Sequence, residues 1–302
     1  MKRRPTRKLL LGALTGILLT GCADTVYFGH WPYGIYRVPT KKGGKATELV
    51  ADQSMVMGLA YSSRGHWLYS AQQAGINAWG TDGSYKGLVT RTGNAECVAL
   101  DPKAGRIYWG DQGREHIAGS DLAGGDFRVY AKHVHYPNAI AVNPKLGLLY
   151  WAQSTPCRGV WMSRLDGSDK HIIATETSVP TGLVVDVKSG RVFWSHGAQL
   201  DGSARIVASN FDGGNRDVIL HDAGADIDDL ALNPGNSRLV WSERRTDGQP
   251  AAIRSMKLDG TELKTICKFT DDHFARSVTV GPYRKKQPFP PPYLRAASTR
   301  AL

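Results

Sequence analysis

The chain has 302 residues and a formal net charge of +11, a balance that would suit a protein that binds nucleic acid. The excess lies at the two ends, because residues 1–21 and residues 282–302 each carry five Lys or Arg and no acid. The rest of the chain is close to neutral, at about +1. A phosphate-binding groove needs cations clustered on one face, so we expect no nucleic-acid partner.

Residues 1–21 have the pattern of a secretory signal. Five cations within residues 2–8 precede an apolar stretch at residues 9–20, and these are the charged and apolar regions of such a signal. The apolar stretch is too short to cross a bilayer as a helix. It ends in Leu19-Thr20-Gly21-Cys22, which resembles the lipobox of bacterial lipoproteins.

The lipobox resemblance implies cleavage before Cys22, a diacylglycerol on its thiol, and a membrane as the first partner of the protein. The expected location is the bacterial cell envelope, and the outer membrane is the default by family analogy. The alternative is an ordinary signal cleavage site followed by an incidental cysteine.

Three short strands are expected next, at residues 26–30, 35–38 and 47–50. They are apolar segments of strand length, and a turn at residues 42–45, Lys-Gly-Gly-Lys, separates the last two. Alone they form an incomplete sheet.

A repeated unit then occurs five times. Its clearest copy is Ala99-Leu100-Asp101-Pro102, a turn, and Ile107-Tyr108-Trp109-Gly110-Asp111. The aromatic position of the unit falls at residues 69, 108, 150, 193 and 240, so the spacings are 39, 42, 43 and 47 residues. A period of about 40–45 residues is typical of a propeller blade.

Each copy continues with two more apolar segments around a Gly-containing turn, such as Asp166-Gly167 or Asp259-Gly260. Asp-Gly between short strands favours a tight hairpin, because Gly tolerates the positive φ that the turn requires. Each unit is therefore expected to be a four-stranded antiparallel sheet.

The last unit stops after one strand, residues 278–282, and the strands at residues 26–50 match the missing three. We therefore predict an all-β fold, a six-bladed β-propeller over residues 22–282, in which the two chain ends share one blade. Pairing the first and last strands closes the ring and removes exposed sheet edges. Residues 283–302, basic and rich in proline, are predicted to be a disordered tail.

These units resemble the YWTD repeats, the class B repeats of the low-density lipoprotein receptor family, over about residues 25–282. The resemblance implies six blades. The fourth position of the motif is Asp only at Asp111; elsewhere it is Gln153, His196, Glu243 or Ala71. We therefore expect the architecture to be kept better than the polar contacts between blades.

The aromatic pairs are expected to pack between neighbouring blades, because both faces of a propeller strand meet another sheet. Stacking on carbohydrate is the alternative for four tryptophans: Trp109, Trp151, Trp194 and Trp241.

Three cysteines remain after Cys22, an odd number for an oxidising compartment. The repeat alignment places Cys97 and Cys157 near the same end of adjacent blades, so a disulfide between them stays open. Buried, inert thiols are the preferred interpretation, Cys267 included.

The start of each inner strand gives a candidate binding site at the mouth of the central channel. Reading five residues before the Asp/Asn position of each unit gives six different residues: Met57, Glu96, Asn138, Thr181, Asp228 and Arg276. Folding alone needs no such variation, which indicates use as a binding surface.

An enzymatic alternative rests on three of these residues. Propellers of the gluconolactonase type place Glu, Asn and Asp around a divalent cation, and Glu96, Asn138 and Asp228 offer oxygen ligands that calcium accepts. The alternative is a metal-dependent lactone hydrolase. Against it, Glu96 and Asp228 would lie three blades apart and Arg276 could neutralise Asp228, so a polar channel without a cofactor is preferred.

Loops between the second and third strands, and one loop between blades, should open on the same face as the channel mouth. Their mixed charges, histidines and aromatics suit recognition of a protein or glycan. The candidate residues are Trp31, Arg114, His116, His133, His135, His196, Arg244 and Arg245. His133 and His135 could alternatively bind a transition metal, although two ligands seldom hold one.

The sequence contains no Gly-rich phosphate loop, no paired-histidine zinc helix and no nucleophile elbow. The leading prediction is therefore a non-enzymatic envelope lipoprotein. Its propeller face would bind an unidentified envelope protein, a glycan or a small ligand.

Overall fold

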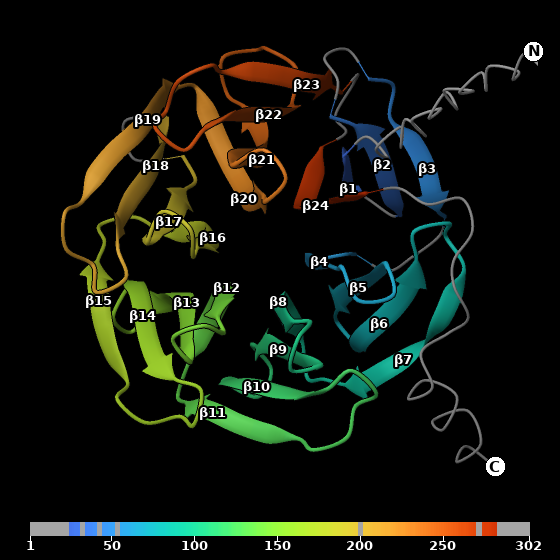
Figure 1. The fold of residues 1–302 in the computed structure, drawn as a ribbon. Helices are drawn as coiled ribbons and strands as arrows, with labels where there is room; N and C mark the ends of the chain where they lie inside the picture. The colour runs from blue at the N-terminus through green and yellow to red at the C-terminus, as the bar shows by residue number, and fades with distance from the viewer. Residues whose placement is uncertain are drawn as a thin grey trace, which may run out of the picture.

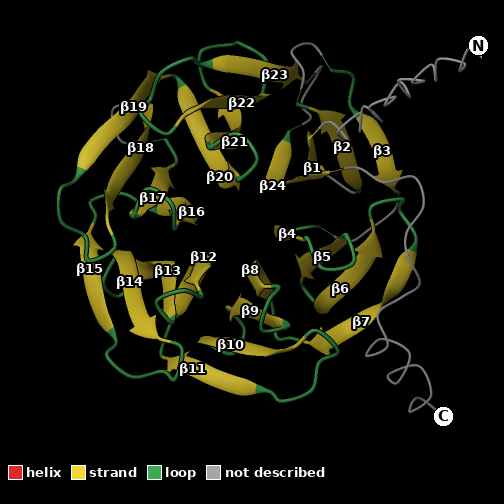
Figure 2. Cartoon of the chain, in the orientation of Figure 1, coloured by secondary structure: helices red, strands yellow, loops and turns green. Residues whose placement is uncertain are grey.

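The computed structural model describes residues 24–30, 34–40, 44–51, 55–198, 202–269 and 274–282. In these ranges the chain forms six four-stranded antiparallel sheets, arranged as blades around a central channel (Figure 1). Loops and turns join the strands (Figure 2). The same ranges contain no helix with the length and apolarity to span a bilayer. The predicted signal, Cys22, Trp31 and the predicted tail lie outside them.

Five blades are continuous in the chain. The first consists of β4 (Gly58–Ser62), β5 (Trp67–Gln72), β6 (Gly75–Gly80) and β7 (Tyr85–Arg91). The second consists of β8 (Ala95–Asp101), β9 (Arg106–Asp111), β10 (His116–Asp121) and β11 (Arg128–Lys132). The third consists of β12 (His135–Asn143), β13 (Leu148–Thr155), β14 (Gly159–Arg164) and β15 (His171–Thr175).

The fourth blade consists of β16 (Pro180–Asp186), β17 (Arg191–His196), β18 (Ser203–Asn210) and β19 (Asp217–Ala223). The fifth consists of β20 (Ala225–Asn233), β21 (Arg238–Arg245), β22 (Ala252–Lys257) and β23 (Lys264–Lys268). The sixth, the closing blade, consists of β24 (Ala275–Pro282), β1 (Asp24–His30), β2 (Ile35–Pro39) and β3 (Thr47–Val50).

The closing blade confirms the predicted sharing of one sheet by both chain ends. β24 pairs antiparallel with β1, and Val26 lies opposite Val280. In Figure 1 the red strand β24 lies beside the blue strand β1. Hydrogen bonds also join this blade to its neighbour on one side, since Thr279 Oγ1 accepts from the backbone N–H of Tyr61 in β4 at 3.1 Å.

The repeated aromatic residues pack between blades, as predicted. Trp109, Trp151, Trp194 and Trp241 are completely buried. The apolar clusters that hold them combine residues of neighbouring blades: Trp109 packs in one cluster with Trp67 of the first blade. Burying a large side chain of this kind stabilises a fold by about 1.5–3 kcal/mol, so these contacts hold the ring together.

The repeated Asp/Asn residues shape the turn after each inner strand. Asp101 accepts hydrogen bonds from the backbone N–H of Lys103 and Ala104, both at 3.0 Å. Asn143 accepts in the same way from Leu146 at 3.2 Å. Such side-chain bonds to the backbone two or three residues on stabilise a tight turn, which explains why this position recurs.

The glycines of the Asp-Gly turns have two structural roles. Gly213 has a φ of 85°, which L side chains rarely adopt. A Cβ at this position would also lie 2.1 Å from the carbonyl oxygen of Ile173, in the outer strand of the preceding blade. The turn of one blade thus packs against the backbone of the next.

One residue of the repeat alignment differs from the sequence interpretation. The fourth motif position of the first blade is Gln72 and not Ala71, because Ala71 pairs with Gly58 as Gly110 pairs with Cys97. The aromatic position of this strand, Tyr69, is aligned correctly, since it pairs with Ala60 as Tyr108 pairs with Ala99, and only the fourth position is miscounted. The buried polar row across the blades is Gln72, Asp111, Gln153, His196 and Glu243.

The cysteines are free in the structure. No disulfide joins the three that are described, and Cys97 and Cys267 are buried, as expected. Burial raises the pKa of the Cys97 thiol and raises that of Cys267 to about 11. Cys157 is exposed, so the expectation of a buried thiol is wrong there.

Candidate functional site at the channel mouth

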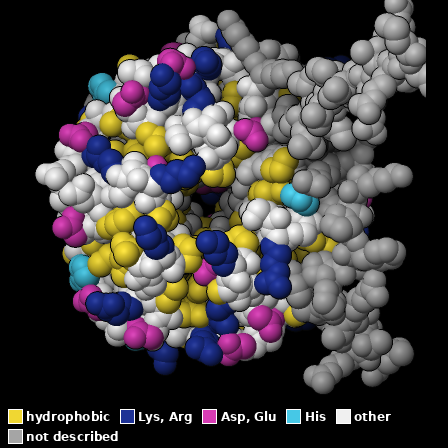
Figure 3. All heavy atoms as spheres, in the orientation of Figure 1, with side chains coloured by type: hydrophobic (Ala, Val, Ile, Leu, Met, Phe, Trp, Pro, Cys, Tyr) yellow, Lys and Arg dark blue, Asp and Glu magenta, His cyan; other side chains and the backbone are white. Residues whose placement is uncertain are grey.

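The inner strands of the six blades surround a channel with a cavity of about 440 Å³. Figure 3 shows an opening at the centre of one face of the molecule. All six residues of the predicted mouth column line the cavity: Met57, Glu96, Asn138, Thr181, Asp228 and Arg276. The column read from the sequence therefore marks one ring of side chains around a common space.

Five of these six residues occupy irregularities in the inner strands. In the second blade, for example, Ala95 and Cys97 pair with consecutive residues of β9, and the residue between them has no cross-strand partner. Such shifts occur at Glu96, Asn138, Thr181, Asp228 and Arg276. A β-bulge leaves one residue outside the ladder, bends the strand locally and re-aims that side chain. The bulges therefore aim the mouth residues independently of the blade core.

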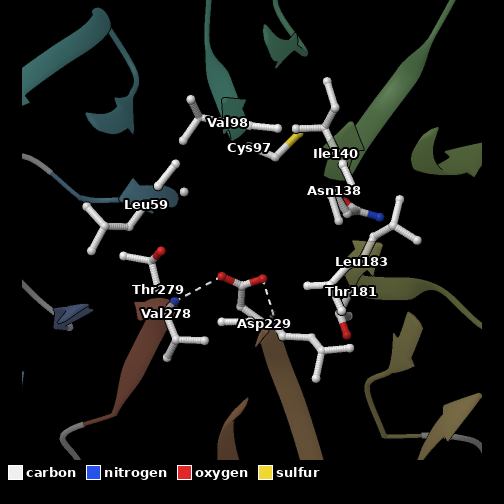
Figure 4. A pocket seen from close by; sticks show the side chains of 18 of the residues that line it. Leu59, Cys97, Val98, Asn138, Ile140, Thr181, Leu183, Asp229, Val278 and Thr279 are labelled. Carbon is white, nitrogen blue, oxygen red and sulfur yellow. Dashed lines mark hydrogen bonds between the residues drawn. The ribbon is translucent and has the colours of Figure 1, made fainter. Parts of the chain in front are cut away.

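Apolar side chains form the wall inside the mouth. Figure 4 shows Leu59, Val98, Ile140, Leu183 and Val278 around the channel, each from a different inner strand. Polar side chains from several blades, Asn138, Thr181 and Thr279 among them, lie between these apolar ones.

A cluster of ion pairs dominates the side of the mouth formed by the fifth blade. Arg244 donates to both carboxylate oxygens of Asp228, at 2.9 and 3.1 Å, and lies 2.6 Å from Asp226. Arg276 of the closing blade approaches Asp228 at 3.5 Å. Burial raises the pKa of Asp228 to about 6, although both arginines act to lower it. The two arginines thus compensate a carboxylate with little access to water.

Asp229 is a site residue that the sequence reading missed. Its carboxylate points into the channel (Figure 4) and accepts hydrogen bonds from the backbone N–H of Val278, at 2.9 Å, and of Leu230, at 2.8 Å. Burial raises the pKa of Asp229 to about 7, and the charge of Asp228 acts in the same direction. Other blades place small residues in this row, such as Cys97 and Ala139. Aligning the residue that follows the mouth position in each repeat would have shown Asp229 as the acidic residue among small ones.

Glu96 faces the same cations from the opposite side of the ring. It accepts a hydrogen bond of 2.7 Å from Asn94. Burial raises the pKa of Glu96, and Arg276 acts to lower it. Arg276 therefore acts electrostatically on both Glu96 and Asp228. Four carboxyl groups and two guanidinium groups line the channel in all, so the described lining is rich in acid.

The three residues of the calcium alternative each have protein partners. Both oxygens of Asp228 accept from Arg244, and Asn138 Nδ2 donates to Ser154 Oγ at 2.7 Å. Within the described ranges, no group of three or more His, Cys, Asp or Glu is arranged to hold a metal ion. A calcium site built on Glu96, Asn138 and Asp228 would have to break the Arg244 clamp.

The predicted loop residues divide into two groups. Arg114, His116 and His133 line a separate small cavity at the rim of the second blade. His135 begins β12, and its Nδ1 lies 3.0 Å from Glu115 beside that cavity.

Five of these residues lie in strands, so their placement on loops is wrong: His116, His135, His196, Arg244 and Arg245. The pairing of Arg245 with Ala225 extends β21 past the predicted loop start, and Arg244 thereby reaches the channel. His196 is buried at the end of β17, where its Nδ1 lies 2.9 Å from Ser178 Oγ. Burial, helped by Arg205, lowers the pKa of His196 to about 4, so the imidazole is neutral near pH 7.

Comparisons with known proteins support the fold class. No family model matches the sequence, and no curated protein matches it. A chain of the nidogen–laminin complex is similar in structure, with a TM-score of 0.73 and 20% identity over 87% of this chain and 100% of that one. A putative TolB from Agrobacterium tumefaciens has a TM-score of 0.66 and 12% identity over 85% of this chain and 96% of that one.

TolB from Acinetobacter baumannii is also similar, with a TM-score of 0.70 and 10% identity over 85% of this chain and 66% of that one. At these identities the likeness concerns the fold alone. Together with the observed sheets it defines the class of protein, a six-bladed β-propeller.

Proposed function

We propose that this protein is a binding module of the bacterial cell envelope, tethered to a membrane through lipid on Cys22, and that its channel mouth contacts a partner protein. The observation that carries the proposal is the ring of six unlike residues around one cavity, five of them on bulges. A scaffold without a partner would need no such chemical asymmetry.

Charge indicates the kind of group that the mouth accepts. The lining holds the carboxyl groups of Glu96, Asp226, Asp228 and Asp229, and only two arginines oppose them. Arg244 is committed to the two neighbouring acids, whereas Arg276 is partly exposed and makes one longer contact. Asp226 and Asp228 are balanced by the two arginines, and burial raises the pKa of Asp229 to about 7. Glu96 is the acid that remains for a cationic side chain of the partner, which can share it with Arg276.

The lipobox resemblance supports the envelope location and the anchor. The similar nidogen–laminin structure is a complex between proteins, which supports binding of a partner protein by this fold. A non-enzymatic role agrees with the Arg244 clamp on Asp228, because each oxygen of that carboxylate already accepts a hydrogen bond from Arg244.

Site-specific photo-crosslinking in cells tests the proposal. A photoreactive residue at Thr181 reports on the mouth, and one at Lys145, in the turn at the other end of β12, reports on the opposite face. We expect an adduct of defined mass from Thr181 only, weakened by Glu96→Gln. No adduct from Thr181, or the same adduct from both positions, would contradict binding at the mouth.

A further inference from the structure

A second cavity, of about 280 Å³, lies on the rim of the second blade. We call it the rim pocket; it is lined by Arg114, Glu115, His116, Val129, Lys132 and His133. The strand register places it at the mouth end of the blade, because Asp111, His116 and Lys132 form one row across β9, β10 and β11. It is separate from the channel.

The cations of the rim pocket are open to a ligand. Lys132 is exposed and makes no ion pair with a described residue. The side chain of Arg114 is about half exposed. Its Nε lies 4.0 Å from Asp111 Oδ2, at the limit of an ion pair, and its Nη1 makes a long bond of 3.4 Å to the backbone carbonyl of Arg91. Both side chains therefore have donors to offer to an anion.

The acids near the rim pocket already have other partners. The carboxylate of Asp111 is fully buried and accepts from the backbone N–H of Gly93, Asn94 and Arg114, at 2.8, 3.0 and 3.1 Å. Glu115 contacts His135 at 3.0 Å. Neither carboxylate is hydrogen-bonded to Lys132.

His116 connects the rim pocket to the buried Asp111. Its Nε2 is buried, makes no hydrogen bond with a described residue, and lies 3.9 Å from Asp111 Oδ2. Burial lowers the pKa of His116, Asp111 acts to raise it, and Arg114 acts to lower it. A proton on Nε2 would face the Asp111 carboxylate, and the His116 side chain also lines the pocket, so protonation adds a charge at the pocket wall.

The backbone of the rim pocket is fixed by a hydrogen bond between its two loops. The carbonyl of Glu115 accepts from the N–H of Val134 at 2.9 Å. Glu115 and His133 have positive φ values, 51° and 57°, a conformation that also occurs at seven other non-glycine residues of the described ranges.

We propose that the rim pocket binds a tetrahedral oxyanion, a phosphate or sulfate group, and binds it more tightly in mildly acidic than in mildly alkaline solution. Arg114 and Lys132 supply the permanent charge, and His116 adds a charge when it is protonated. The charged and titratable groups that surround His116 are Asp111 from β9, Arg114 and Glu115 from the following turn, Lys132 from β11, and His133 and His135 from the connection to the next blade.

Sulfate is the suitable probe because it stays a dianion throughout the range from pH 5.5 to 8. We would titrate it into the protein and follow the histidine ring signals by NMR, with His116 assigned from the His116→Gln variant. We expect saturable binding that is at least fivefold tighter at pH 5.5 than at pH 8. His116→Gln should show a clearly smaller difference between the two pH values than the wild type, and His116→Gln with His133→Gln should show none.

Charge variants provide the matched comparison. Arg114→Gln with Lys132→Gln removes two cations from the rim pocket, and Lys103→Gln with Lys145→Gln removes two exposed cations from turns at the opposite face. We expect at least a tenfold loss of sulfate affinity in the first pair and less than a twofold change in the second. No saturable shift in the wild type, equal loss in both pairs, or equal affinity for acetate would overturn the proposal.

The source of the oxyanion is distinguished by two further probes, inorganic phosphate and vesicles of phosphatidylcholine with phosphatidic acid. Vesicle binding lost in the Arg114/Lys132 variant indicates a lipid headgroup, and binding of phosphate without vesicle binding indicates a soluble ligand. The results for the rim pocket do not depend on whether the channel mouth binds a partner. That question is tested separately by the Glu96→Gln variant.

Discussion

Asp229 in β20 accepts a hydrogen bond of 2.9 Å from the backbone N–H of Val278 in β24. Because β24 belongs to the blade built from both chain ends, this bond joins the fifth blade to the blade that closes the ring. On the other side of the closing blade, Thr279 is bonded to Tyr61 of the first blade. The junction of the two chain ends is therefore held from both neighbours.

Asp229→Ala should lower the free energy of unfolding by about 2 kcal/mol, because the N–H groups of Val278 and Leu230 lose their acceptor. Asp229→Asn keeps a carbonyl oxygen and should lose less. Urea unfolding of the three proteins measures the difference. Equal losses of unfolding free energy in the two variants would show that the hydrogen bonds accepted by Asp229 do not stabilise the fold.

The pH dependence of stability should also change in Asp229→Asn. In the folded state the pKa of Asp229 is about 7, whereas the pKa of an Asp in an unfolded chain is about 3.9. This group therefore lowers the free energy of unfolding as the pH rises from about 4 to about 7.

His196, with a pKa of about 4, acts in the opposite direction, so the informative quantity is the difference between wild type and Asp229→Asn from pH 5 to pH 8. We expect this difference to vary with pH. Asp247→Asn is the control, because the pKa of Asp247 is lowered to about 2 and it does not titrate in this range. A wild type and an Asp229→Asn variant with parallel stability curves would argue against a raised pKa.

Arg244→Ala should destabilise the fold by about 2 kcal/mol, because it leaves the buried Asp228 carboxylate with only the longer Arg276 contact. Breaking a fully buried ion pair typically costs about 3–5 kcal/mol. The expected loss is smaller here because Arg244 is itself partly exposed. Adding Asp228→Asn should recover most of the loss. Additive losses in the double variant, measured by thermal unfolding, would refute the coupling.

Gly213→Ala should destabilise more than Gly190→Ala. Both glycines have positive φ, 85° and 74°, and each substitution carries a backbone penalty of about 1 kcal/mol. Only at Gly213 would the new Cβ meet the Ile173 carbonyl, since nothing lies within 4 Å at Gly190. The difference in unfolding free energy between the two variants reports the contact between blades. A difference near zero would mean that the backbone at Ile173 moves to accept the new Cβ without cost.

Cys22→Ala should move the protein from the membrane fraction to the soluble fraction of cells, because the thiol that would carry the diacylglycerol is lost. Fractionation followed by immunoblotting measures this, with Cys157→Ala as the control that keeps Cys22. Membrane retention of Cys22→Ala would rule out the lipid anchor and leave the channel proposal intact.

Calcium should leave the thermal unfolding midpoint unchanged. A ligand that binds only the folded state stabilises it by RT ln(1 + [L]/Kd), and the Arg244 clamp already occupies the Asp228 oxygens. A calcium-dependent rise that disappears in Glu96→Ala would instead support the metal-dependent hydrolase.

The repeat predicted most of the fold, because each blade obeys the same local rules. Asp101 and its equivalents cap turns, and glycines such as Gly213 pack against the next blade, so a period in the sequence translates into a period in space. The predicted closing blade follows from the same matching and agrees with the observed pairing of β24 with β1.

The site was predicted only in part. The mouth column was found because its residues occupy equivalent positions, but the roles of Arg244 and Asp229 depend on long-range contacts that no local pattern encodes. Arg244 reaches the channel because β21 continues past Glu243, and Asp229 is satisfied by backbone of a strand about fifty residues away. The burial of His196 likewise depends on Ser178 and Glu176 of the preceding connection.

The bulges at the start of the inner strands also bear on how such a protein can change its partner. A residue without a cross-strand partner, such as Glu96, lies outside the paired positions of its ladder, so its replacement removes no ladder pair. The residues that would contact a partner and the residues that determine the fold thus occupy different positions of the same repeat. New specificity can accumulate one blade at a time while the ring stays closed.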